Sequence, residues 1–406
     1  MSDAIPGHVP PELIRDFSIF SSPGMEPNRG GCPFKALAKV RDEPRIFYVP
    51  EPGRGRPGNW VVTSAADMRT VLQDPEIFSS KGIAGFSQLL GERWDLLPLE
   101  VDPPKHAKYR SLLEPEMTVK KMNALVPAIE GFADALIAEV KGQSGCEFVK
   151  SIAQRFPVMV FLKLLGLPDN QLEIFADWAW GLLHGPSMAE QAAAARAIKD
   201  HLVHAIEQEA TQAVNNTLLS RIVHGEIDGV PLNDEEKLGY AFLVFLAGLD
   251  TVASSLSFYF RHLAEDQDFQ ARLRANPELI ATAIDELLRM YSVVTTSRLV
   301  TRDTELAGVG LKAGDWVSLT LSLGNRDQLE HVEPDEVRLD RGNKPHFTFG
   351  AGKHRCMGSH LARTEMVIFM RKFLEAIPTF RLASDTQPLV HGAGVFGVKE
   401  LQLAWD

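Results

Sequence analysis

The stretch FTFGAGKHRCMG, residues 347–358, decides how this chain is interpreted, because it sets one cysteine in a glycine-rich loop directly before a predicted helix. Its glycines permit tight turns and a close approach of the backbone. A cysteine just before a helix lies at the positive end of the helix dipole, near free N–H groups, and both effects lower a thiol pKa. His354 and Arg355 can add positive charge. Cys356 is therefore predicted to be a metal ligand or a nucleophile; the alternative is an inert, buried cysteine beside a glycine turn.

The length and net charge of the chain limit the kinds of protein that it can be. It has 406 residues, 45% of them hydrophobic, which is enough to bury a large core, and we expect a single domain over residues 1–406 with an extended N-terminal segment at 1–30. The 42 basic and 53 acidic residues give a net charge of −11. A global nucleic-acid-binding role is therefore excluded, because phosphate binding needs a basic surface.

The cysteine count and the hydropathy pattern indicate the cellular compartment in which the protein is expected. Cys32, Cys146 and Cys356 are too few and too scattered for a disulfide framework, and no pair has the CxxC spacing of a zinc ribbon or an iron–sulfur site. The N-terminus has no basic start followed by an apolar run, so no signal peptide is predicted. The longest fully apolar stretch, residues 241–249, is too short to span a bilayer. We therefore expect a soluble, cytoplasmic protein.

Helical periodicity dominates the chain. It covers most of residues 105–225, and residues 233–265 contain no proline and predict one long helix that is apolar nearly all round, hence buried. Another helix is predicted from Pro277, a favoured first helical position, to Tyr291. Proline and glycine punctuate the first helical region at Pro157, 166–168 and 185–186.

Strand signals are short and few. A hairpin is predicted around the sequence GRGRPG, residues 53–58, and strand-like pieces follow Tyr291. A long irregular stretch runs from about Asn325 to Cys356, before a helix from about Ser359. The fold class is therefore mainly α with a small β-rich part, at about 45–65, 292–320 and 378–406.

The cysteine loop resembles the haem-binding loop of the cytochrome P450 superfamily, whose pattern F-G-x-G-x-H-x-C-x-G it matches at residues 349–358. Three further motifs stand in the order found in that family: Asp102 to His106 followed by Arg110, residues 247–251 (AGLDT), and 286–289 (ELLR). The similarity covers essentially the whole chain and is greatest to bacterial, ferredoxin-dependent class I members of the camphor-hydroxylase type. It implies a single-domain cytochrome P450 fold, with a long central helix over the haem and the cysteine loop on the proximal side.

The resemblance also implies the cofactor and its contacts. A non-covalent haem b would have its iron bound by the thiolate of Cys356, a strong electron donor that favours O–O cleavage. Phe349, Gly350 and Gly358 would shape the loop around this ligand, and Gly248 would lie on the other face of the haem. The cationic side chains implied to face the haem propionates are His106, Arg110, Arg298 and His354.

Asp250 and Thr251 interrupt the apolar helix with residues that are poor helix formers. One explanation is local, since a threonine can bond back to a main-chain carbonyl and kink a helix. The resemblance implies a catalytic explanation, in which a groove beside Gly248 accepts dioxygen, Thr251 hydrogen-bonds it and Asp250 connects it to bulk protons. Oxygen activation consumes two protons, so a relay is chemically required.

Glu286 and Arg289 are three residues apart and share one face of the predicted helix. Such a pair is frequent by chance and adds only tenths of a kcal/mol when it lies on a surface. In the family the pair is buried and binds a third arginine, for which Arg341 has the right spacing. The resemblance therefore implies a structural role, holding the cysteine loop.

The predicted substrate pocket is apolar. Residues 94–98 correspond to a segment that contacts substrate in the most similar branch of the family, where a tyrosine hydroxyl binds a ketone. Trp94 occupies that position in this chain. Its indole is larger than a tyrosine side chain and has a hydrogen-bond donor but no acceptor. We expect a compact, mostly hydrocarbon substrate of monoterpenoid or norisoprenoid type. Ordinary core packing is the alternative for several of the predicted lining residues, which are Trp94, Phe86, Leu96, Leu243, Leu246, Val294, Val395 and Phe396.

Electrons must come from outside the chain, which has no G-x-G-x-x-G between a strand and a helix and no room for a nucleotide domain. The resemblance implies external NAD(P)H, a ferredoxin reductase and a [2Fe–2S] ferredoxin. A local basic patch on an acidic protein suits steering of an acidic ferredoxin, although each lysine alone is more simply a solvated surface residue. The predicted patch comprises Lys105, Lys108, Arg110, Lys344, Lys353 and Arg355.

Taken together, these features predict a monomeric haem-thiolate monooxygenase that hydroxylates a small hydrophobic molecule with O2. Two alternatives stay open, a peroxygenase driven by hydrogen peroxide and a haem-binding or sensor protein without turnover. The Asp250–Thr251 pair argues against both, because it supplies a proton relay that neither needs.

Overall fold

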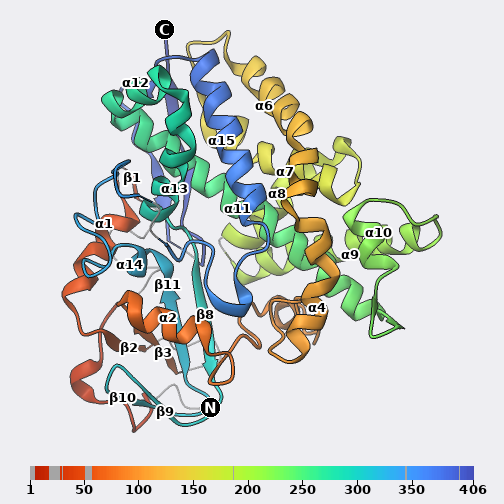
Figure 1. Cartoon of the computed structure of the whole chain (residues 1–406), viewed down its shortest axis with the longest axis vertical. Helices are drawn as coiled ribbons and strands as arrows, with labels where there is room; N and C mark the ends of the chain where they lie inside the picture. The colour runs from red at the N-terminus through yellow and green to blue at the C-terminus, as the bar shows by residue number, and fades with distance from the viewer. Residues whose placement is uncertain are drawn as a thin grey trace.

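The computed structural model describes residues 5–17, 28–29, 31–50, 57–185, 187–342, 345–392 and 394–406. Figure 1 shows a helix-rich part that fills the upper and right side of the view, beside a smaller β-rich part at the lower left. This is the mainly α, single-domain arrangement that the sequence predicts. In the predicted extended segment 1–30, residues 11–13 form a 3-10 turn and residues 28–29 a short strand.

The helices follow the predicted periodic regions. In chain order they are α1 (Pro33–Ala38), α2 (Ala65–Gln73), α3 (Phe86–Leu89), α4 (Lys105–Leu113), α5 (Val119–Ala124), α6 (Val126–Val140), α7 (Arg155–Leu165), α8 (Leu172–His184), α9 (Met188–Ala210), α10 (Leu218–Val223), α11 (Asp234–Glu265), α12 (Gln267–Ala275), α13 (Ile280–Met290), α14 (Leu321–Asn325) and α15 (Ser359–Ala376). Pro157, which was predicted to punctuate the helical region, lies in the first turn of α7, where a missing N–H costs nothing. Pro277 starts a 3-10 turn, and α13 begins only at Ile280.

The strands occupy the predicted β-rich ranges and a few short stretches outside them. They are β1 (Asn28–Arg29), β2 (Ile46–Pro50), β3 (Gly58–Val62), β4 (Phe78–Ser79), β5 (Gly145–Glu147), β6 (Glu226–Ile227), β7 (Val230–Pro231), β8 (Thr295–Val300), β9 (Thr304–Leu306), β10 (Val309–Leu311), β11 (Trp316–Thr320), β12 (Arg381–Leu382), β13 (Leu389–His391), β14 (Gly397–Glu400) and β15 (Gln402–Ala404). The main sheet has the order β2-β3-β11-β8-β4, and the predicted hairpin pairs Ile46 with Val62. Residues 51–56 of its turn lie outside the described residues.

The long helix α11 runs through the centre of the molecule (Figure 1). Asn233 and Glu236 close a capping box at its start, so the helix begins where the sequence changes from loop to apolar run. It is long and apolar enough to span a membrane, but 72% of its most apolar window is buried inside the protein, as expected of a core helix. Residues up to Leu249 pack in one hydrophobic cluster with α7 to α10, and residues from Val252 pack in a second with α6, α13 and α15. Asp250 and Thr251 therefore lie where the two cores meet.

Candidate active site

The cysteine loop lies between α2 and the start of α15 and is shaped by its glycines. The N–H of Cys356 donates to the carbonyl of Phe349 at 2.8 Å. Gly350 and Gly352 have φ values of 67° and 70°, in the left-handed region that favours glycine. A Cβ atom on Gly352 would lie 2.4 Å from the carbonyl oxygen of Leu72, at the end of α2. The loop can therefore approach α2 this closely only with glycine at this position.

The thiol of Cys356 is surrounded by protein but keeps accessible surface. Burial raises the pKa of the thiol, and the N–H of Gly358 and nearby arginines such as Arg355 oppose this only in part. The prediction that the loop alone lowers this pKa is therefore wrong, because removing the sulfur from water outweighs the helix start. A thiolate here needs a compensating cation, which an iron ion supplies.

A buried cation lies next to the loop. Arg298 on β8 is 4% exposed and forms no ion pair with any described residue; it donates to the Thr296 hydroxyl at 3.2 Å and to the Ser297 carbonyl at 2.7 Å. Burial lowers the pKa of Arg298 to about 10, with the charge of Asp102 acting in the opposite direction. A guanidinium this well buried favours an anionic partner, which a propionate can be.

Two histidine rings lie close together near Arg298, with their planes tilted by 53°. The ring centroids of His106 and His354 are 4.2 Å apart, and Nε2 of His354 is buried without a hydrogen-bond partner among the described residues. Burial lowers the pKa of His354 to about 3 and also lowers that of His106. The prediction that these histidines act as cations is corrected here: they offer neutral N–H donors, and the positive charge comes from Arg298 and Arg110.

These features fit haem b. Within the described residues, an accessible thiol, a buried guanidinium without an ion pair and a buried imidazole nitrogen without a hydrogen-bond partner match one iron ligand and the propionate groups. In the described part of the chain, no group of three or more His, Cys, Asp or Glu side chains is placed to hold a metal ion. Cys356 is therefore not part of a described three-ligand protein site, and as a haem ligand it would be the one protein ligand on its side of the iron.

Glu286 and Arg289 on α13 form a buried, two-bond ion pair, with N–O distances of 2.8 and 2.7 Å. Arg341 donates to the same carboxylate at 2.7 Å, and each of these three side chains is at most 7% exposed. Burial raises the pKa of Glu286, but bonds from the two arginines and from the N–H of Arg338 outweigh it and hold this pKa below its usual value. Glu286, Arg289 and Arg341, called the triad below, therefore form a buried charge network rather than an exposed surface pair.

The triad is joined to the cysteine loop by two polar residues. Arg289 donates to the carbonyl of Asn325 at 3.0 Å, and the amide of Asn325 donates to the hydroxyl of Thr348 at 2.9 Å. The N–H of Phe347 donates to Asn325 Oδ1 at 2.5 Å, and Thr348 donates to the carbonyl of Leu288 at 2.7 Å. Through these bonds, α13 fixes the first residues of the loop that carries Cys356.

One face of α11 remains accessible inside the molecule. Every residue from 238 to 261 is described, and all are buried except Leu243, Leu246, Ala247, Gly248 and Thr251. These five recur at helical spacing and so share one face. Four of these five residues were predicted for the oxygen groove or the substrate pocket. The fifth, Ala247, is the most accessible residue of this face.

Asp250 and Thr251 point to different surroundings. The Thr251 hydroxyl donates to the carbonyl of Ala247 at 3.3 Å, which is the bond that the local explanation predicts. A hydroxyl that donates in this way can still accept a hydrogen bond on its accessible side. Asp250 is 8% exposed, and its Oδ1 lies 2.8 Å from Nε2 of His184, the last residue of α8. The carboxylate is therefore held by a group that sequence reasoning did not select.

The predicted pocket residues divide into two sets. Phe86, Leu243, Leu246, Val294 and Val395 keep accessible surface, and Val294 and Val395 form a bridge between the β8 and β14 regions. Leu96 and Phe396 are almost fully buried, and the ring of Phe396 packs edge-on against Phe34 at 5.6 Å. For these two residues the packing alternative describes the structure.

Trp94 is buried and already uses its one donor. Its indole N–H donates to Glu92 Oε2 at 2.7 Å, and the same carboxylate pairs with Lys199 of α9. The ring packs on Phe242 of α11 at 5.0 Å. Trp94 therefore presents apolar surface only, and nothing in the sequence identified Glu92 as its partner.

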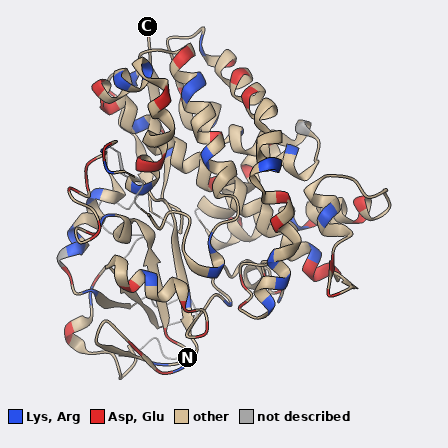
Figure 2. Ribbon diagram, in the orientation of Figure 1, with Lys and Arg blue, Asp and Glu red and all other residues tan. Residues whose placement is uncertain are grey.

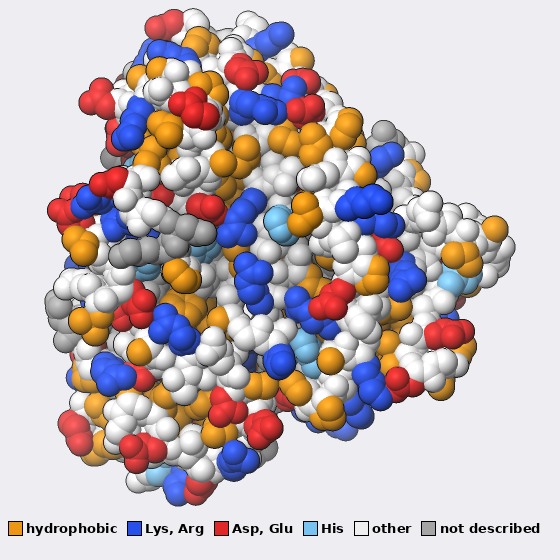
Figure 3. All heavy atoms as spheres, viewed as in Figure 1, with side chains coloured by type: hydrophobic (Ala, Val, Ile, Leu, Met, Phe, Trp, Pro, Cys, Tyr) orange, Lys and Arg blue, Asp and Glu red, His pale blue; other side chains and the backbone are white. Residues whose placement is uncertain are grey.

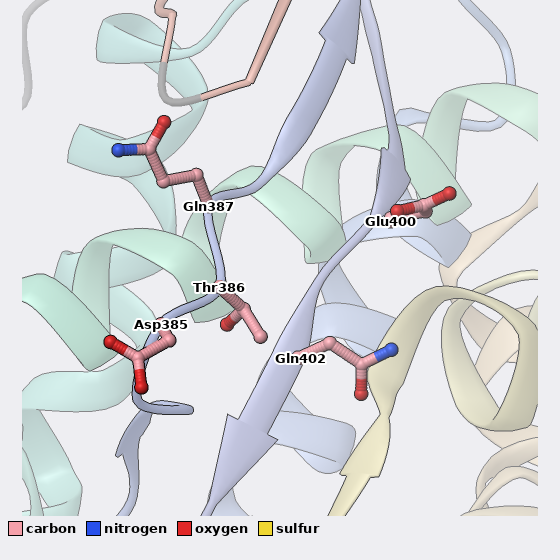
Figure 4. A pocket seen from close by; sticks show the side chains of 5 residues that line it. All are labelled: Asp385, Thr386, Gln387, Glu400 and Gln402. Carbon is pink, nitrogen blue, oxygen red and sulfur yellow. The ribbon is translucent and has the colours of Figure 1, made fainter.

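A separate hollow lies on the outer surface over β14 and β15. Figure 4 shows its polar lining from Asp385, Thr386, Gln387, Glu400 and Gln402. None of the residues predicted for the haem, the relay or the pocket contributes to it. The hollow therefore plays no part in the site described here.

The predicted basic patch lies on α4 and the cysteine loop, which meet where Arg110 donates to the carbonyl of Lys353 at 3.2 Å. Charges of both signs are interspersed over the helices, but Lys and Arg side chains gather in the middle of this face, over α4 and the start of α15 (Figures 2 and 3). Lys105, Lys353 and Arg355 are exposed, whereas Lys108 pairs with Asp228. Arg110 also pairs with Glu114 at 3.0 Å. Lys344 lies outside the described residues.

Comparison with known proteins gives one family. The Cytochrome P450 family model matches residues 170–391. The chain is 41% identical to a probable cytochrome P450 127A1 of Sinorhizobium fredii over 100% of this chain and 97% of that one. It is 32% identical to a pentalenic acid synthase of Streptomyces avermitilis over 85% of this chain and 88% of that one.

Solved structures of cytochromes P450 are also similar to this chain. The crystal structure of cytochrome P450 CYP101C1 has a TM-score of 0.88 at 32% identity, covering 99% of this chain and 100% of that one. CYP101J2 has a TM-score of 0.88 at 30% identity with the same coverage. From these matches, which cover the whole chain, the chain belongs to the cytochrome P450 family and is a haem b-dependent monooxygenase.

Proposed function

We propose that this cytochrome P450 hydroxylates a small, compact, hydrophobic substrate of monoterpenoid or norisoprenoid type, with electrons from a [2Fe–2S] ferredoxin, as a cytoplasmic monomer. The observation that carries the substrate class is the accessible apolar face of α11 at Leu243, Leu246 and Ala247. Beside it, Trp94 offers no free donor for a carbonyl or hydroxyl. Binding would therefore rest on shape and on removal of apolar surface from water.

The cofactor would be held from both sides by residues already described. Cys356 would bind the iron, Arg298 and Arg110 would pair with the propionates, and His106 and His354 would donate hydrogen bonds to them. Bound in this way, haem b supplies oxygen activation and insertion of one oxygen atom into the substrate. The protein contributes the ligand, a dry apolar pocket and the protons.

Proton delivery is assigned to Asp250 and Thr251. Insertion of one oxygen atom releases the other as water and so takes up two protons and two electrons. The Thr251 hydroxyl lies on the accessible face of α11 and can hold a water there by donating or accepting. The buried Asp250 carboxylate, one residue earlier, can pass protons toward that water from the other side of the helix.

Replacing Thr251 by alanine tests this relay. We expect product formed per NADH oxidised to fall on the order of tenfold or more, because without the hydroxyl at this position more of the O2 would take up two electrons and two protons and leave as hydrogen peroxide, with no product formed. The measurement is product, NADH and peroxide in the same reaction, and Thr251→Ser, which keeps the hydroxyl, is the matched control. Full coupling in Thr251→Ala would remove Thr251 from the mechanism.

Replacing Trp94 by alanine tests the pocket. The ring packs on Phe242, so its loss should weaken binding of terpenoids by about tenfold, equivalent to about 1.4 kcal/mol. Trp94→Phe, which keeps apolar area but cannot bond Glu92, should bind nearly as well as the wild type. The measurement is the substrate-induced spin shift of the ferric protein across a terpenoid panel, and unchanged binding in Trp94→Ala would exclude a pocket role.

Charge reversal at Lys105 and Lys108 tests the partner surface. The rate of ferredoxin-driven reduction should fall about tenfold at low salt, and the difference should shrink as salt is added, because steering charges are screened. Lys312→Glu, an exposed lysine between β10 and β11, is the control. If the double variant were reduced at the wild-type rate at low salt, ferredoxin would have to dock elsewhere.

Product formation itself decides between the proposed function and its alternatives. With a terpenoid substrate, ferredoxin, reductase and NADH should give hydroxylated product, while hydrogen peroxide alone should give little. Product from peroxide alone at the higher rate would identify a peroxygenase. Spin shifts without product from either source would identify a haem-based binding protein.

A further inference from the structure

A buried cluster of titratable side chains lies against Asp250, and no step described above uses it. Nε2 of His184 is 2.8 Å from Oδ1 of Asp250, and the ring of His391, from β13, lies 4.3 Å from that of His184. Trp180, one turn before His184 on α8, covers both rings at centroid distances of 4.3 and 6.0 Å. The cluster therefore joins α8, α11 and β13 at the point where the relay residue Asp250 is fixed.

Three polar atoms of this cluster have no hydrogen-bond partner among the described residues. They are Nδ1 of His184, Oδ2 of Asp250 and Nε2 of His391, and all three are buried. Each such atom costs about 1–3 kcal/mol, so three together call for a function. A metal site is not that function, because the described side chains include no set placed to hold an ion. Atoms that take up and release protons need free lone pairs, and these atoms have them.

One of the two imidazoles in the cluster is held neutral. Burial lowers the pKa of His391 to about 3, and the neighbouring His184 lowers it further. The titratable and charged groups that act on His391 are His184 from α8, Asp250 from α11 and Lys399 from β14. His391 also fits only because β14 has a glycine opposite, since a Cβ atom on Gly397 would lie 2.2 Å from its Nε2. His391 is therefore a fixed, neutral neighbour, which leaves His184 and Asp250 as the pair that exchanges a proton.

We infer that His184 is a positioning residue that hands protons to Asp250, with Trp180 as its half-buried cover toward solvent; this rests on the proposed role of Asp250. A proton is taken up at Nδ1 of His184, and the proton on Nε2 passes to Oδ1 of Asp250. The imidazole is then neutral and the carboxyl is protonated. Asp250 releases the proton toward the water beside Thr251 and returns to the carboxylate, and His184 must exchange tautomer before the next transfer.

A merely structural His184 would behave differently. It would stay a neutral donor that orients Asp250 at every pH, and its charge would not respond to the carboxylate. The two cases are separated by the charge state of the ring, which can be observed without turnover.

The first test is an NMR titration of histidine ring nitrogens in the ferrous carbon monoxide form of the holoenzyme. The His184 ring should exchange between imidazolium and imidazole as the pH is varied, and His391 should stay neutral. In Asp250→Asn the imidazolium form of His184 should be less populated, because the carboxylate that favours the charged ring is gone. A His184 ring that is neutral throughout, or that titrates identically in Asp250→Asn, would overturn the inference.

The second test is the pH profile of kcat in His184→Gln, whose side-chain N–H can still bond Asp250 but cannot carry a proton. Haem content and substrate spin shift should be unchanged, and kcat should fall on the order of tenfold. The dependence of kcat on pH should also differ from that of the wild type, because glutamine does not titrate. His201 is a half-buried histidine whose ring lies 5.5 Å from that of Trp178 on α8, and His201→Gln should behave as the wild type.

The outcomes separate this inference from the proposed function. Absence of ferredoxin-driven product in the wild type would count against the proposed function, while the NMR titration would still decide the role of His184. Wild-type kcat and pH profile in His184→Gln would count against the inference alone. If His184→Gln failed to bind haem, the titration in the wild type and Asp250→Asn would decide.

Discussion

Replacing Cys356 by serine should reduce monooxygenase activity to background. A serine hydroxyl is a far weaker electron donor than a thiolate, so the push toward O–O cleavage is lost. The carbon monoxide difference spectrum of the reduced protein should lose the band position typical of thiolate ligation, even where haem remains bound through Arg298 and the apolar pocket. The measurement combines that spectrum with product formation driven by ferredoxin.

The other two cysteines provide the controls. Cys32 and Cys146 are free, and burial raises the pKa of Cys146 to about 12, which makes it a poor thiolate ligand. Cys32→Ser and Cys146→Ser should keep the thiolate spectrum and turnover. A thiolate spectrum in Cys356→Ser, or its loss in either control, would assign the iron ligand to a different residue.

Replacing Glu286 by alanine should cost about 3–5 kcal/mol of folding free energy, because it leaves Arg289 and Arg341 as buried charges without their shared carboxylate. That is a large part of the 5–15 kcal/mol that stabilises a typical protein, so the variant should be marginal at best. Since Asn325 and Thr348 tie the triad to the cysteine loop, haem should be lost early. Denaturant unfolding followed by both circular dichroism and haem absorption measures the two effects.

Asp285 on the same helix provides a matched control. Its carboxylate pairs with Arg363 at 2.6 Å but is 52% exposed, so Asp285→Asn should change stability by less than about 1 kcal/mol. The pKa of Glu286 is held low in the folded protein, so its contribution is present at neutral pH and is lost as pH falls through that pKa. Glu286→Ala should therefore lose less stability on acidification than the wild type. Equal costs for the two substitutions would place the triad among ordinary surface pairs.

The positions of many site residues could be predicted from short stretches of sequence. The loop around Cys356 and its glycines depend on turns between neighbouring residues, and the accessible face of α11 depends on helical periodicity. Both are short-range properties, so the predicted positions of Gly350, Leu243 and Thr251 agree with where the structure places them. The Glu286–Arg289 spacing fixed a shared helix face, although its burial was known only from the family resemblance.

The remaining features depend on which elements meet in space. The Asp250 carboxylate contacts His184, 66 residues earlier, and His391 reaches them from β13. Trp94 gives its N–H to Glu92, and Lys199 of α9 completes that contact. The sequence also predicted a lowered pKa for Cys356 and charged histidines at 106 and 354, and burial reversed both. Sequence alone therefore determined the fold class and the accessible face of α11, and it selected Cys356 as the candidate iron ligand. Only the tertiary structure decided the protonation states and the partner of Asp250, because desolvation and contacts between distant segments exist only once the chain has folded.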